Sequence, residues 1–66
     1  SLIKNIKILL NDNSILVRVA SVWALSMLSK KVFMDEVGKR IKQEKNTIVV
    51  NEWLECKEEI IRNSKG

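Results

Sequence analysis

The feature that most constrains the fold is a polar turn that leads directly into a long apolar run. The turn, Asn11–Ser14, is made of residues that hydrogen-bond to their own backbone and end helices. The run from Ile15 to Ser29 is apolar around most of a helical circumference, with Arg18 one turn inside it. We therefore predict a helical hairpin that cannot bury its apolar face alone and that packs in an array.

The apolar residues recur at helical spacing along the whole chain, which predicts an all-α fold. Pro is absent and only two Gly occur, and both facts favour helices over sheets. We expect the second helix to form the central layer and Gly38 to weaken the third by about 0.5–1 kcal/mol relative to Ala. Lys30 and Lys31 are expected at the C-terminus of the second helix, where the helix dipole favours cations. The predicted helices span residues 2–10, 15–29, 32–43 and 48–62.

These helices form two antiparallel hairpins that a weak internal repeat relates. The first hairpin covers residues 1–29, the second and more degenerate one covers 30–62, and 63–66 is expected to be a frayed tail. Asp12 is aligned with Glu44 when the two hairpins are compared, and in this repeat register the second copy lacks the arginine. A period of about 30 residues is typical of the short type of HEAT-like repeat, and the chain is therefore expected to be a fragment of an α-α superhelix.

Composition excludes most catalytic classes. The chain has 66 residues, no His, and Cys56 as its single cysteine, so Ser–His or Cys–His catalysis, an internal disulfide, a zinc site and an iron–sulfur cluster are not expected. No glycine-rich phosphate loop is present. The glutamates of the last helix are interpreted as a solvated face. We predict that the chain alone is not an enzyme and holds no cofactor or metal.

The lone thiol fits a reducing compartment, and no apolar run reaches the roughly 20 residues of a membrane span. We expect a cytoplasmic protein without a membrane contact. Because Ser1 opens directly on an apolar helical pattern, we also expect a fragment of a longer chain.

The net charge of +4 is unevenly placed. Residues 1–31 hold five basic residues against one acidic residue, and residues 32–66 hold seven of each. Two interpretations stay open: a surface that faces phosphates, or a solvated lysine face in a lysine-rich chain. From the residues alone we favour the solvated face.

Four side chains are expected to have structural roles. Asp12 should accept hydrogen bonds from exposed amides at the start of the second helix, and Arg18 should reach back to it or to the neighbouring repeat's turn. A ligand-binding Arg18 is the alternative. Trp23 is expected in the core. Trp53 is expected to pack against the second helix or the next repeat, and the alternative is an exposed ring on which a base stacks.

Two motifs carry a more specific resemblance. Residues 12–25 have the pattern D-x-x-x-x-V-R-x-A-x-x-W-A-L, and residues 49–53 have V-x-x-E-W. Together they resemble the C-terminal, HEAT-like end of epoxyqueuosine reductases, which complete queuosine synthesis on tRNA. The family's second motif usually reads Val-Arg-x-Glu-Trp, so Val50 departs from it.

The resemblance implies a module without catalysis of its own. The family's cobalamin and two iron–sulfur clusters belong to upstream domains, and its HEAT-like end helps to hold the tRNA anticodon stem-loop. Lys4, Lys7, Lys30 and Lys31 then become candidates for phosphate contacts, which give affinity and salt dependence but no sequence readout. The expected partners are tRNA and either the rest of a longer chain or neighbouring repeats.

Two alternatives remain. One is an orphan HEAT-repeat scaffold that docks another protein through the open apolar faces around Ile3 and Leu10 or around Trp53 and Ile60. The other is a nonfunctional gene remnant.

Overall fold

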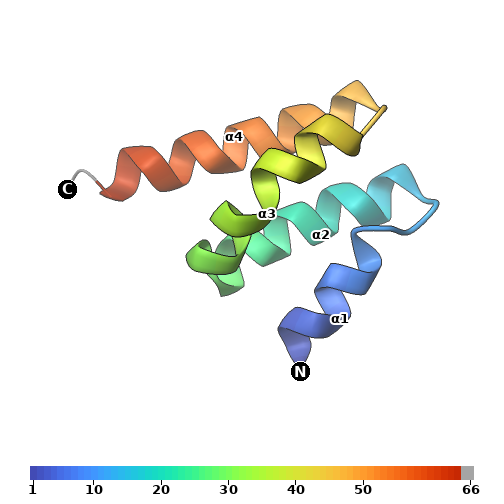
Figure 1. The fold of residues 1–66 in the computed structure, drawn as a ribbon, viewed down its shortest axis with the longest axis horizontal. Helices are drawn as coiled ribbons and strands as arrows, with labels where there is room; N and C mark the ends of the chain where they lie inside the picture. Colours follow the sequence, from blue (N-terminus) through green and yellow to red (C-terminus); the bar gives the residue numbers. More distant parts are fainter. Residues whose placement is uncertain (65–66) are drawn as a thin grey trace.

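The computed structural model describes residues 1–64, and these residues form four α-helices with no strand among them. Figure 1 shows two helix pairs, each folded back on itself through a short turn. The prediction of an all-α chain with about four helices is confirmed. The helices are α1 (Leu2–Leu9), α2 (Ile15–Leu28), α3 (Lys30–Gln43) and α4 (Thr47–Ser64).

A single residue separates α2 from α3. Ser29 has an extended backbone (φ −156°, ψ 103°); its amide donates to the carbonyl of Leu25 and its hydroxyl accepts from the amide of Val32. Ser29 thus ends one helix and caps the next. Lys30 and Lys31 therefore begin α3, and the prediction that they end the second helix was wrong. The positive end of the α3 dipole disfavours them there.

The last helix is longer than predicted. Asn46 caps α4, because its side-chain oxygen accepts from the amides of Ile48 (2.9 Å) and Val49 (3.4 Å). Asn63 and Ser64, which were expected in a frayed tail, are helical. The other two residues of that tail, 65 and 66, lie outside the described residues.

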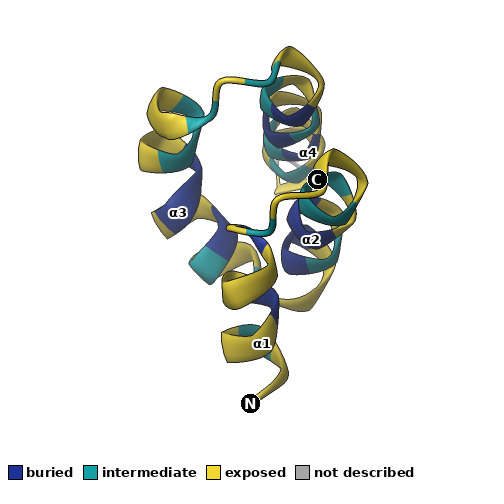
Figure 2. Cartoon of the chain, turned by 90° about the vertical axis from the view of Figure 1, so that its right-hand side faces the viewer, coloured by how far each residue is buried: buried dark blue, intermediate teal, exposed yellow. Residues whose placement is uncertain are grey.

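The helices form two layers, and α2 is central. α2 packs against each of the other three helices, which confirms its predicted central position. Figure 2 shows α2 and α4 together on one side and α3 and α1 on the other. In Figure 1, α2 and α4 run in the same direction. The molecule is 18 Å thick along its shortest axis, which fits two helices of about 10 Å each.

The core lies where α2, α3 and α4 meet, and Ile6 and Leu10 extend it to α1. Val22 and Leu25 of α2 and Phe33 of α3 are fully buried. Trp53 of α4 is only 2% exposed and packs on Phe33 with ring centroids 5.0 Å apart. Trp53 therefore packs inside the chain, and an exposed stacking role for it is excluded.

The prediction that Trp23 belongs to the core was wrong, since its side chain is 56% exposed. The neighbours of α2 cover the side that carries Val22 and Leu25. Trp23 lies on another side of the same helix, together with the exposed Leu16 and Met27. An apolar pattern that surrounds the helix could not indicate which side stays uncovered.

None of the four helices within residues 1–64 has the combination of length and hydrophobicity that crossing a bilayer requires.

Gly38 provides a test of the helix energetics. It is exposed in the middle of α3, and a Cβ added there would meet nothing within 4 Å. Gly38→Ala should raise the free energy of unfolding by about 0.5–1 kcal/mol, because alanine loses less backbone entropy. Urea unfolding followed by circular dichroism measures the change. Gly38→Val should gain less, since a β-branched residue is a poorer helix former; an equal or larger gain for valine would contradict this account.

Candidate functional site

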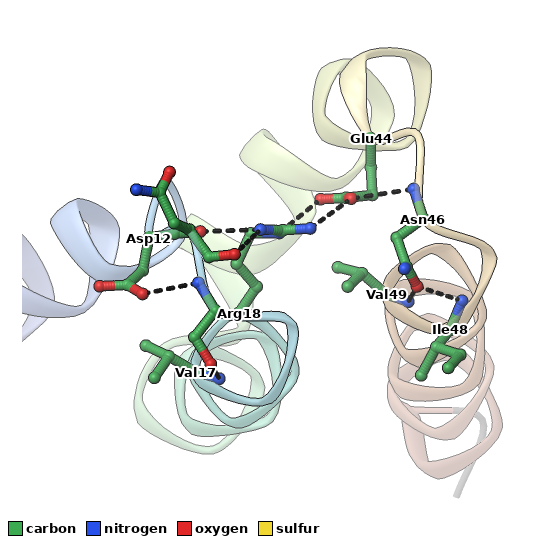
Figure 3. Close-up of polar contacts among 9 residues, drawn as sticks. Asp12, Val17, Arg18, Glu44, Asn46, Ile48 and Val49 are labelled. Atoms are coloured by element: carbon green, nitrogen blue, oxygen red, sulfur yellow. Dashed lines mark hydrogen bonds and ion pairs between the residues drawn. The ribbon is translucent and has the colours of Figure 1, made fainter.

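Arg18 holds the two turns of the molecule together (Figure 3). Its Nε and Nη2 donate to Oε1 and Oε2 of Glu44, both at 3.1 Å. Its Nη1 donates to the backbone carbonyls of Asp12 (2.8 Å) and Asn13 (3.2 Å). The Arg18 side chain is 18% exposed and that of Glu44 is 13% exposed. One guanidinium therefore connects the α1–α2 turn to the α3–α4 turn through a bidentate ion pair.

This geometry refines the predicted roles of Asp12 and Arg18. The carboxylate of Asp12 accepts from the amide of Ser14 (2.8 Å), so Asp12 orders the turn itself. Arg18 contacts Asp12 through the backbone carbonyl and also reaches the second turn. The two contacts that the sequence offered as alternatives for Arg18 exist together.

The internal repeat is present in the turns. Glu44 accepts from the amide of Asn46 (3.1 Å), as Asp12 does from Ser14. Ser14 caps α2 through the amide of Val17, and Asn46 caps α4. Residues that are aligned in the two hairpins, with Asp12 matched to Glu44, therefore make the same kinds of hydrogen bond.

The four candidate lysines do not form one surface. Lys4 and Lys7 of α1 border a hollow of about 480 Å³, together with Arg40 of α3. Lys30 borders a different groove, and Lys31 pairs with Asp35 of its own helix at 3.5 Å. The two α1 lysines lie beside further basic residues, with Arg40 at the same hollow and Lys39 and Arg40 around the carboxylate that Lys7 contacts.

Those basic residues surround one buried carboxylate, Glu36, which is 4% exposed. Its oxygens lie 3.3 Å from Nζ of Lys7, 3.4 Å from Nζ of Lys39 and 3.0 Å from Nε of Arg40. We call these four residues the Glu36 cluster. Three cations around one anion leave a net charge of +2. Arg40 also donates to Oδ1 of Asn11, so the cluster ties α3 to α1 and its turn.

Opposing effects set the pKa of Glu36. Burial, the largest single effect, raises it. The hydrogen bonds from Arg40 and Lys7 and the charges of Lys7 and Lys39 lower it, and together they outweigh burial. The pKa of Glu36 therefore lies below its ordinary value of 4.5.

Sequence reasoning missed this cluster. The spacing of Glu36 to Lys39 and Arg40 (i, i+3 and i, i+4) is visible in the chain and predicts pairs within one helix. The contact with Lys7 is tertiary, and no local pattern indicates it.

A second candidate surface is a groove of about 360 Å³ between α2 and α4. Cys56 lies buried beside it, with Sγ 3.4 Å from Oε2 of Glu52. Burial, with neighbouring carboxylates, raises the pKa of the Cys56 thiol to about 11, so the thiol stays protonated and poorly nucleophilic near neutral pH. We call this surface the α2–α4 groove; its borders include Trp23, Met27, Lys30, Glu52, Glu55 and Glu59.

Comparison of the chain with protein-family models, curated proteins and solved structures finds no match. The interpretation of these surfaces therefore depends on their geometry and charge.

The turn-to-turn ion pair leads to a stability prediction. Arg18→Met should lower the free energy of unfolding by about 2–4 kcal/mol, because it leaves the largely buried Glu44 carboxylate without its partner. Arg62→Met is the matched control, since it removes an exposed pair with Glu58 (3.6 Å) and should cost less than about 0.5 kcal/mol. Urea unfolding measures both variants, and equal losses would contradict the importance of the buried pair.

The Glu36 cluster leads to a pH prediction. Since the folded pKa of Glu36 lies below 4.5, its ionised form stabilises the fold above that pH, and the contribution is lost as the pH falls through the folded pKa. The free energy of unfolding of the wild type should therefore fall more steeply below pH 4.5 than that of Glu36→Gln. Urea unfolding from neutral pH to about pH 3 measures this difference. Parallel pH profiles would show that Glu36 is not held ionised by its neighbours.

Proposed function

We propose that this chain is a non-catalytic, HEAT-like module that docks tRNA through the basic surface around Glu36. The observation that carries the proposal is the cluster of three cations held around one buried carboxylate. The resemblance to the C-terminal end of epoxyqueuosine reductases supplies the RNA class, a tRNA anticodon stem-loop, and a place at the end of a longer enzyme.

The geometry suits contact with phosphates. The side chains of Lys7 and Lys39 remain 45% and 61% exposed although their ammonium groups pair with Glu36. Lys4 is also exposed, beside the hollow that Lys7 and Arg40 border. Glu36 holds the cations in place but neutralises only one of them, so the surface can still release counterions from a nucleic-acid backbone.

The paired turns support the HEAT-like part of the proposal. Equivalent turn and capping hydrogen bonds recur in the two hairpins, and Arg18 connects the first turn to the second. Such a connection is a contact between neighbouring hairpins, the kind of contact on which repeat proteins depend for stability.

A scaffold role remains the second candidate, and the exposed apolar side chains indicate which faces it would use. Leu10 is 5% exposed and Trp53 2% exposed, so these two side chains are covered within the chain, whereas Ile3 and Ile60 are only partly buried. Apolar surface is open at Leu16 and Ile48, which are 80% and 61% exposed. This exposure favours contact with another protein.

Binding of an anticodon stem-loop RNA, measured by fluorescence anisotropy over a salt series, tests the RNA proposal. Affinity should fall steeply with salt, by a slope of about −0.9 for each phosphate contacted in a duplex. The double variant Lys4→Ala/Lys39→Ala should weaken binding and reduce the slope by about 2, because it removes two phosphate contacts.

The matched control is Lys31→Ala/Lys45→Ala, which removes the same charge from exposed positions outside the Glu36 cluster. It should retain most of the affinity and the salt slope. Equal losses in the two double variants, or no binding at low salt, would sink the proposed RNA surface.

A further inference from the structure

We propose that the α2–α4 groove binds a cationic amphipathic helix of a partner protein. The groove shares no bordering residue with the hollow beside Lys4 and Lys7. The inference therefore does not depend on RNA binding.

One wall of the groove belongs to an apolar stripe of α2. Leu16, Ala20, Trp23 and Met27 are all exposed, and their spacing (i, i+4, i+7, i+11) places them on one side of the helix. Trp23 and Met27, at 56% and 69% exposed, border the groove itself. Tryptophan contributes strongly to binding where it becomes covered by a partner.

The other wall is acidic. Glu52, Glu55 and Glu59 border the groove at spacings of three and four residues, so they lie on one side of α4. Among the ion pairs of residues 1–64, none involves these three carboxylates, whereas the neighbouring Glu58 pairs with Arg62. Among residues 1–64, Lys30 is the one basic residue on the border, so the four charged groups described there have a net charge of −2.

The internal repeat relates the two walls. The repeat register that aligns Asp12 with Glu44 also aligns Trp23 with Glu55 and Met27 with Glu59. The two helices run in the same direction (Figure 1). At these aligned positions α2 carries apolar residues and α4 carries acidic ones. The groove therefore has one apolar side and one anionic side along its length.

Charge and shape identify the occupant. A helix that carries apolar residues on one face and Lys or Arg beside them contacts both walls at once. Nucleic acids and anionic lipids are repelled by the three carboxylates. A purely apolar helix leaves these carboxylates without partners.

The test uses a synthetic Leu/Lys amphipathic peptide of about 14 residues, which forms a helix of about 21 Å. Trp23 is the reporter: coverage of its ring should shift the tryptophan emission to shorter wavelength, while Trp53 is already buried. The same peptide with Glu in place of Lys is the ligand control and should produce no shift.

Variants of the chain locate the site. Glu55→Lys and Glu59→Lys should each raise the Kd of the Leu/Lys peptide by about fivefold, as attraction at the groove becomes repulsion. Glu58→Lys makes the same charge change on the exposed part of α4 outside the groove and should leave the Kd within about twofold. Circular dichroism confirms that each variant is folded.

Three outcomes would overturn the proposal: no binding by the wild type, equal loss in all three variants, or equal binding of the Glu peptide. Analytical ultracentrifugation of the chain alone tests whether a second copy of the chain occupies the groove. A dimer of the wild type that Glu55→Lys disrupts would assign the groove to self-association and would also overturn it.

Discussion

The arrangement of the four helices depends on the ion pair between Arg18 and Glu44. The guanidinium uses one side for the carbonyls of the first turn and the other for the carboxylate of the second. Both partners are largely shielded from water, so each requires the other. Because α2 and α4 begin directly after these turns, the ion pair connects the starts of the two helices, and the core between them holds the rest of their length.

Charge is distributed over two surfaces of opposite sign. The Glu36 cluster joins α1 to α3 by side chains, and its three cations outnumber its carboxylate. Within residues 1–64, the α2–α4 groove is bordered by three carboxylates and one lysine. The net charge of +4 therefore hides a separation that a count of charges along the chain does not show. An RNA ligand and a cationic helix would use different surfaces, because the two hollows share no bordering residue.

The sequence predicted what local chemistry determines and missed what packing determines. The helices follow from apolar spacing, and the break at Asn11–Ser14 follows from side chains that hydrogen-bond to the backbone. Arg18 was identified because few charged residues interrupt an apolar run. The contact of Lys7 with Glu36 joins residues far apart in the chain, and no local rule indicates it. Ser29 was missed as a joint because one serine between two helical patterns resembles a helix interior.

The misplaced Trp23 follows from the central position of α2. A helix that is apolar around its circumference is suited to be covered on every side. Within residues 1–64, α1, α3 and α4 pack against α2, and the stripe that contains Trp23 stays exposed. The apolar residues of α2 therefore suit a helix that is covered on one more side than residues 1–64 cover. The acidic wall on α4 makes a neighbour on that side specific, because it favours a helix with a cationic face over one that is apolar throughout.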